Sequence, residues 1–194
     1  MDIDSFVVGT NEQRALPDAD GVVRREVPVS TLAQGDGGTL KGIELGAKLA
    51  LSDFTESEFL QNFGGDINYT HSPGESTEQL LSGGDAPFPE NSENVFNFVV
   101  WYESDNWEAR LAYNYRSERL VLLNQSWHGL ALYQDETAYL DAGVSYKATD
   151  NISVFLNASN ITDESERFYL EVENQEAWEN TFEPRYTLGI RGTF

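Results

Sequence analysis

The sequence has few basic residues, only two histidines and no cysteine, and each shortage argues against a class of function. Its 194 residues include 12 Lys and Arg against 33 Asp and Glu, and the net charge is -21. This charge disfavours nucleic-acid binding, because phosphate contacts need clustered cations. Without cysteine the chain can form neither disulfides nor thiolate metal sites. His71 and His128 stand alone in expected loops, where a histidine is more typically solvated than catalytic.

Long apolar runs and catalytic motifs are missing as well. The mean hydropathy is -0.45, and no run approaches the ~18 apolar residues of a transmembrane helix. The sequence has no nucleophile elbow, P-loop or dinucleotide fingerprint, so we expect no enzyme, cofactor or metal site. Residues 1–8 are acidic and lack the basic and apolar regions of a signal peptide. The acidity fits solubility of long surface loops, or attraction of cations to a pore mouth.

The sequence is rich in period-2 alternation, most clearly in residues 184–194. Apolar side chains share one parity there, and cationic and hydroxyl side chains share the other. The apolar set is Tyr186, Leu188, Ile190 and the terminal Phe194. The same alternation predicts strands near residues 43–51, 59–70, 94–103, 106–116, 136–147 and 151–159. With residues 1–8 as the end of one more strand, the expected total is eight.

The connections between these strands alternate in length. The expected short turns lie near residues 52–57, 104–106 and 148–151. The expected long loops are 9–38, 71–93, 119–135 and 162–183. Aromatic residues flank the short turns: Phe59, Tyr102, Trp107 and Tyr146. Short periplasmic turns, long extracellular loops and an aromatic girdle are typical of outer-membrane barrels, so we predict an all-β fold, an antiparallel transmembrane β-barrel portion. A soluble sandwich, the alternative, leaves the rings at the strand ends unexplained.

Several segments carry a family resemblance. Residues 38–45 (GTLKGIEL) resemble the K-G-x-E strand of TonB-dependent receptor barrels, and 108–117 (EARLAYNYRS) resemble another strand of that family. Residues 140–163 resemble its penultimate hairpin, with Ile161 in place of the usual Leu, and 185–194 fit its closing strand. The resemblance implies a barrel of about 22 strands with a plugged lumen, which imports iron chelates, cobalamin, nickel complexes or oligosaccharides with TonB energy.

The resemblance covers only the last third of such a barrel. It implies that residues 1–38 are a strand end and a long loop, and that 39–194 are the last seven strands. The plug domain, the TonB box and the earlier strands lie outside it, so this region is expected not to transport alone. Together with the missing signal peptide, this indicates that Met1 is not the true start. An unpaired first strand would make the isolated region prone to aggregation.

The resemblance also supplies partners and candidate residues. Tyr186, Leu188, Ile190 and Phe194 resemble the signal read by the barrel-assembly machinery. Outer-membrane lipid, the TonB complex (through the missing plug) and a small-molecule solute are the other expected partners. Loop rings are candidate ligand contacts, because sugars and iron chelates both pack on aromatic faces. These rings are Phe88, Trp127, Tyr133 and Trp178.

Two alternatives stay open at this point. Eight strands can close by themselves, so the chain could be a self-contained outer-membrane barrel with a structural or adhesion role. An outer-membrane hydrolase would need turnover that depends on His71 or His128. Neither the residues nor the resemblance identifies the transported solute.

Overall fold

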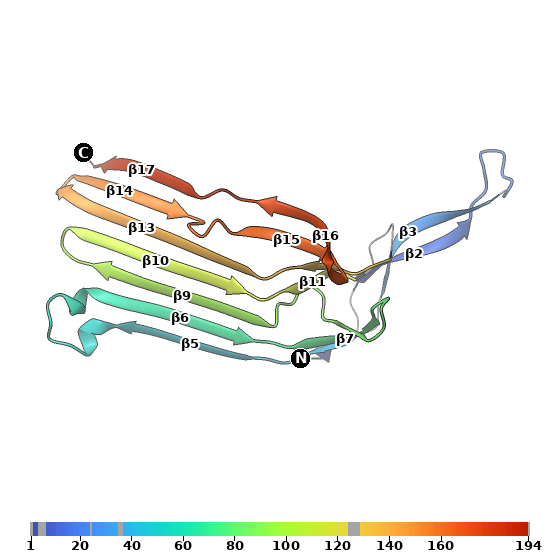
Figure 1. The fold of residues 1–194 in the computed structure, drawn as a ribbon, viewed down its shortest axis with the longest axis horizontal. Coiled ribbons are helices and arrows are strands. Elements are labelled where there is room, and N and C mark those ends of the chain that lie inside the picture. Colours follow the sequence, from blue (N-terminus) through green and yellow to red (C-terminus); the bar gives the residue numbers. More distant parts are fainter. Residues whose placement is uncertain (1, 4–6, 24, 35–36, 124–128, 194) are drawn as a thin grey trace.

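The computed structural model describes residues 2–3, 7–23, 25–34, 37–123 and 129–193. Within them, seven long strands form one antiparallel sheet in the order β17-β14-β13-β10-β9-β6-β5, which we call the wall sheet (Figure 1). Its strands are β5 (Ile43–Ala50), β6 (Phe63–His71), β9 (Asn94–Glu103), β10 (Trp107–Arg116), β13 (Thr137–Thr149), β14 (Ile152–Ser159) and β17 (Arg185–Gly192). The order follows the chain as an up-and-down meander. The predicted all-β antiparallel fold is confirmed.

Polar residues close two short turns at one end of the wall sheet. At the β9–β10 turn, the Ser104 and Trp107 backbones bond to each other, and the Trp107 amide also donates to Ser104 Oγ at 3.2 Å. At the β13–β14 turn, the Asn151 amide donates to Thr149 Oγ1 at 3.3 Å. Side chains that bond their neighbours' backbone favour turns over continued strands. Both turns fall where the sequence predicts them.

The connection between β5 and β6 is longer than predicted. Strand β6 begins at Phe63, and two short 3-10 helices precede it, η1 (Leu51–Asp53) and η2 (Leu60–Asn62). Amide side chains hold this coil closed: Gln61 donates to the Thr55 carbonyl at 3.1 Å, and Asn62 to the Glu58 carbonyl at 3.2 Å. The predicted turn at 52–57 lies within this connection but is too short, and the predicted strand start near 59 is wrong, because local side-chain bonds compete with the strand. None of the described helices is long and apolar enough to cross a membrane.

The four predicted long loops contain strands of their own at the opposite end of the wall sheet. One small sheet has the order β11-β12-β15-β16 and another β1-β4-β7-β8, while β2 and β3 pair as a hairpin that extends away from the wall (Figure 1). The first sheet comprises β11 (Arg119–Leu122), β12 (Leu132–Gln134), β15 (Ser165–Leu170) and β16 (Val172–Thr181). The others are β1 (Asp2–Ile3), β4 (Gly38–Leu40), β7 (Gly74–Gln79), β8 (Asp85–Pro87), β2 (Val7–Ala15) and β3 (Glu26–Gln34).

The strand end predicted at residues 1–8 is only partly present. Asp2–Ile3 pairs with β4, which leads directly into β5, so β1 lies at the outer edge of that strand. Val7 instead begins the β2–β3 hairpin, which occupies most of the expected loop 9–38. The strand prediction was therefore wrong from residue 7 onward. A nine-pair hairpin satisfies more backbone groups there than a single extended strand would.

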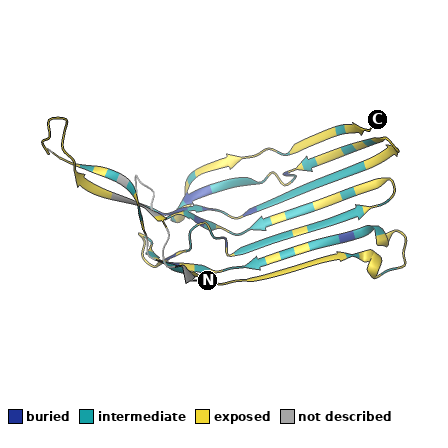
Figure 2. Ribbon diagram, turned by 180° about the vertical axis from the view of Figure 1, so that it is seen from behind, coloured by how far each residue is buried: buried dark blue, intermediate teal, exposed yellow. Residues whose placement is uncertain are grey.

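The buried apolar residues lie in the loop sheets. Leu120, Ala131 and Ala86 form a small core, and Tyr133 packs against it. Most residues of the wall strands are exposed or of intermediate burial, and the edge strands β5 and β17 are almost entirely exposed (Figure 2). A sheet with two accessible faces gains little hydrophobic stabilisation in water. The wall sheet is therefore not stabilised chiefly by a buried core of its own.

Glycine 64 has a packing role on the wall sheet. It lies opposite Trp101 in the β6–β9 register, and the indole ring covers the place of a Cβ atom at residue 64. Gly46 lies on the same face of the neighbouring strand, but a Cβ atom there would have Asn68 Nδ2 at 3.5 Å, an ordinary contact. Of these two positions, close approach of a ring to the backbone thus requires glycine at 64 and not at 46.

This difference predicts the stability of two alanine variants. Gly64→Ala displaces the Trp101 ring and should destabilise the sheet by about 1–3 kcal/mol, as overpacking does. Gly46→Ala, its matched control, should be neutral or slightly stabilising, because alanine restricts the unfolded chain. Urea unfolding in detergent, followed by the heat-dependent shift on cold gels, measures both. Equal midpoints for the two variants would contradict the assigned role of Gly64.

Candidate functional site

The wall sheet has one apolar face, which we call the outer face. Antiparallel register aligns apolar residues of neighbouring strands into continuous cross-strand rows. One row runs Leu188, Leu156, Val144, Ala109, Tyr102 and Phe63. Exposure on this face is high, reaching 75% for Leu188 and 74% for Ile190. Contiguous exposed apolar surface of this extent marks a membrane contact.

Aromatic clusters border the outer face at the short-turn end. The Phe63 and Tyr102 rings lie 4.9 Å apart, and Phe59 adds a third ring at 5.2 Å from Phe63. Farther along the sheet, the Trp107 and Tyr146 rings lie 4.6 Å apart. The predicted aromatic residues at the turns thus do form ring clusters. Amphipathic rings of this kind belong at the membrane–water interface.

The opposite, inner face is polar and carries both signs of charge. The register places twelve polar and charged residues on it: Glu44, Lys48, Asp66, Asn68, Glu108, Arg110, Asn114, Arg116, Asp141, Lys147, Arg185 and Arg191. Asn68 donates across β5 and β6 to Glu44 at 2.9 Å. Part of this face lines a trough of about 950 Å³. Polar inward and apolar outward residues are the arrangement of a transmembrane barrel wall.

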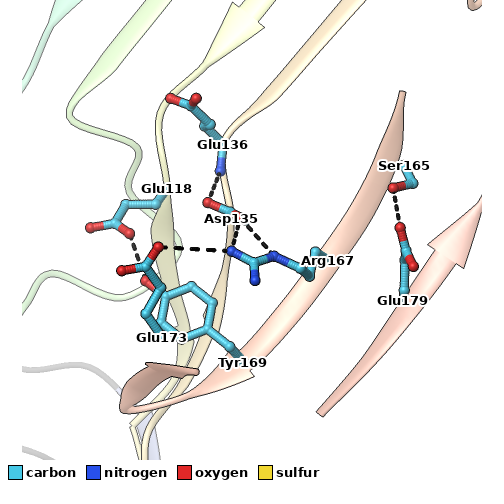
Figure 3. Close-up of polar contacts among 8 residues, drawn as sticks. All are labelled: Glu118, Asp135, Glu136, Ser165, Arg167, Tyr169, Glu173 and Glu179. Atoms are coloured by element: carbon cyan, nitrogen blue, oxygen red, sulfur yellow. Dashed lines mark hydrogen bonds and ion pairs between the residues drawn. The ribbon is translucent and has the colours of Figure 1, made fainter. Parts of the chain in front are cut away.

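At the other end of the wall sheet, the loop sheets pack on one another to form what we call the extracellular rim. Two ring pairs stack there, Tyr133 on Tyr169 at 5.4 Å and Phe168 on Trp178 at 4.8 Å. Charged side chains link the strands around these rings (Figure 3). Arg167 donates from Nε and Nη2 to Asp135 Oδ2, at 2.9 and 2.5 Å. The hydrogen bond and the charge of Asp135 raise the pKa of Arg167.

Tyr169 is fixed by the stacked Tyr133 ring and by a hydrogen bond from its hydroxyl. Its hydroxyl donates to Glu118 Oε2 at 2.6 Å (Figure 3), and burial together with this bond raises its pKa. Burial likewise raises the pKa of Tyr133. Both phenols therefore stay protonated at neutral pH. In the rim, Tyr169 acts as a hydrogen-bond donor, and both rings act as packing surfaces.

Glu171 bridges three segments of the rim. It lies in the corner between β15 and β16, with φ of 31°. One carboxylate oxygen accepts from the Ser82 amide at 2.5 Å, and the other from the Ala131 amide at 3.2 Å. Burial works toward a higher pKa for Glu171, but the bonds from Ser82 and Ala131 outweigh it and lower the pKa. The ionised carboxylate thus replaces backbone acceptors that these amides lack.

The predicted ligand-contact rings have different surroundings. Phe88 packs closely over Gly38 and Gly74. Tyr133 packs against the small core around Leu120. Trp178 stacks on Phe168 and is 43% exposed. Trp127 lies outside the described residues, as do Phe194 and His128. Tyr186, Leu188 and Ile190 share the outer face of β17.

Sequence reasoning missed the bridges among the loops. The sequence predicts a loop over residues 162–183, yet this segment contains β15 and β16. Arg167 and Tyr169 lie in β15, and Glu171 lies between the two strands. The alternation of Arg167 and Tyr169 with Phe168 is the signal that could have revealed β15. Their partners are 32 and 51 residues away in sequence, and no local pattern connects them. No group of three or more metal-ligating side chains occurs within the described part of the chain.

The geometry defines a class of protein. An antiparallel meander with an apolar outer face, aromatic clusters at short turns and long structured loops at the other end is the wall of an outer-membrane β-barrel. Residues 1–161 match the family described as TonB dependent receptor-like, beta-barrel, and the chain belongs to that family. No curated protein and no solved structure matches it.

Membership confirms the family resemblance and sets the broad function. The chain is part of an outer-membrane receptor or transporter of a Gram-negative bacterium, and its family comprises transporters, not enzymes. Members of the family interact with TonB and bind a solute.

The Glu171 bridge predicts a pH-dependent rim. A carboxylate with a lowered folded-state pKa stabilises the fold above its unfolded-state pKa, and this stabilisation is lost as pH falls through the folded-state value. Limited proteolysis of the loops should therefore accelerate in acid, below the usual carboxyl range. In the Glu171→Gln variant, the loops should be cleaved faster at neutral pH, and the cleavage rate should depend less on pH. An unchanged pH profile in that variant would assign the transition to other carboxylates.

Proposed function

We propose that this chain takes part in TonB-energised uptake of a bulky solute, an iron chelate, cobalamin or an oligosaccharide. The observation that carries the proposal is the combination of aromatic rings in the rim with a polar, mixed-charge inner face. Rings offer apolar contact to a sugar or a chelate, and polar groups along the wall replace its hydration. Trp178 is the described candidate ring with the greatest exposure.

We also propose that residues 39–194 are the last seven strands of a larger barrel and that 1–38 are a strand end with a long loop. In the described sheet, β5 and β17 are the two edges and do not pair with each other. β1 lies against β4, where a preceding strand would continue. An open sheet of this kind does not favour the alternative of a self-contained eight-stranded barrel. TonB would act through a plug domain.

Outer-membrane lipid and the barrel-assembly machinery are proposed as partners of the outer face and of β17. The support is the register of Tyr186, Leu188 and Ile190 with the apolar residues of β14, which leaves their side chains exposed along an edge strand. Phe194 completes the pattern in the sequence.

Two tryptophan variants test whether the rim contacts the solute. Trp178→Ala removes an exposed ring of the rim and should weaken binding by about 2 kcal/mol, roughly thirtyfold in Kd. Trp107→Ala is the matched control, since its ring packs against Tyr146 in the girdle and is 48% exposed, and it should leave binding unchanged. Titrations with a ferric hydroxamate, cyanocobalamin and a linear oligosaccharide identify the class of solute.

Uptake of the solute class that binds should stop when the proton gradient is dissipated, and uptake that continues would refute TonB coupling.

Adjacent residues of β10 test the lipid contact. Leu111 faces outward, while Ala112 faces inward and pairs in register with Asp141. Leu111→Arg should cost about 2–4 kcal/mol if it lies near the bilayer midplane. Ala112→Arg should cost far less, because the new charge meets a carboxylate in the lumen. Unfolding in phospholipid vesicles measures both, and an equal cost would contradict the assignment of faces.

A further inference from the structure

The outer face is not uniform at the short-turn end, where an apolar groove of about 460 Å³ crosses β5, β6 and β9. Gly65 forms its floor, because this residue occupies the outer row between Leu49 and Val100 without a side chain. Phe59 and Leu60 from the connection between β5 and β6 form the wall of the groove nearest the turn. The groove is thus built by two elements, a gap in a cross-strand row and a structured connection beside it.

The connection next to this groove is uniformly acidic. Residues 51–62 contain Asp53, Glu56 and Glu58 and no Lys or Arg, and all three carboxylates are exposed. Asp53 closely follows Leu51, and Glu58 directly precedes Phe59, so the charges flank groove-lining residues. Hydrogen bonds from Gln61 and Asn62 to the connection's own backbone fix its course. The β13–β14 turn differs in this respect, since Lys147 pairs there with Asp150 at 3.3 Å.

We propose that the groove binds one acyl chain of a phospholipid from the periplasmic leaflet, with an amine headgroup of the phosphatidylethanolamine class. The groove continues the surface that faces lipid, so an acyl chain is the apolar group that reaches it. Lipid tails and leucine side chains are equally apolar, and preference must therefore come from close packing in the groove and from the headgroup. The ammonium group is attracted by the acidic connection, whereas a phosphatidylglycerol headgroup is repelled.

Native mass spectrometry of the protein extracted from outer membranes tests this proposal with defined phosphatidylethanolamine and phosphatidylglycerol. Gly65→Leu fills the groove, and the backbone accepts it because an added Cβ atom meets only the Val99 carbonyl oxygen, at 3.4 Å. We expect retention of phosphatidylethanolamine to fall roughly fivefold in this variant. Ala142→Leu is the matched control, since Ala142 lies in the same outer row, away from the groove. Its retention should be unchanged.

The headgroup is tested separately. Asp53→Asn, Glu56→Gln and Glu58→Gln combined should remove the preference for phosphatidylethanolamine over phosphatidylglycerol, a change of roughly five- to tenfold. Leu60→Ala lies outside the strands and opens the groove wall, so it should also weaken retention without dependence on strand packing. Equal retention by wild type, Gly65→Leu and Leu60→Ala would overturn the site. Equal binding of the two lipids by the wild type would overturn the headgroup assignment.

Discussion

The register between neighbouring strands is the constraint on which the rest of this structure depends. Because side chains alternate with period 2, a slip of one residue in any pair would move a whole apolar set to the polar face. The observed pairs keep Leu188, Leu156 and Val144 in one row, and Lys48 opposite Asp66 on the other face. With few enclosed side chains in the wall, the difference between lipid and a polar lumen specifies the register.

The extracellular rim is stabilised by different interactions from those of the wall. Its strands are short, and it relies on a small apolar core with charged bridges such as Arg167 to Asp135 and Glu171 to two backbone amides. These bridges join segments that are far apart in sequence, so each one closes a long loop. The wall tolerates changes that preserve polarity and face, whereas the rim depends on individual donors and acceptors. A receptor can therefore vary its rim for different solutes while its wall stays in the membrane.

Much of the wall and little of the rim could be predicted from the sequence. Alternation located all seven wall strands and assigned the faces of the others, but it left the register of β9 open, because apolar residues occur there on both parities. It failed at the β5–β6 connection, where Gln61 and Asn62 stabilise 3-10 turns, and in the loops, where β15 and β16 were not recognised. Among the candidate ligand contacts, composition identified rings but could not distinguish Phe88, packed over glycines, from the exposed Trp178.

The sequence by itself determined the fold class, the outer and inner faces and the membrane setting, because each follows from local periodicity and from where aromatic residues fall along a strand. Only the tertiary structure decided which loop segments meet, which rings stack and where the outer face is hollow. Gly65 is one glycine among 16 in the sequence, and it becomes the floor of a groove only beside Leu49, Val100 and the coiled connection. Such features depend on contacts between distant residues, and period-2 alternation carries no information about them.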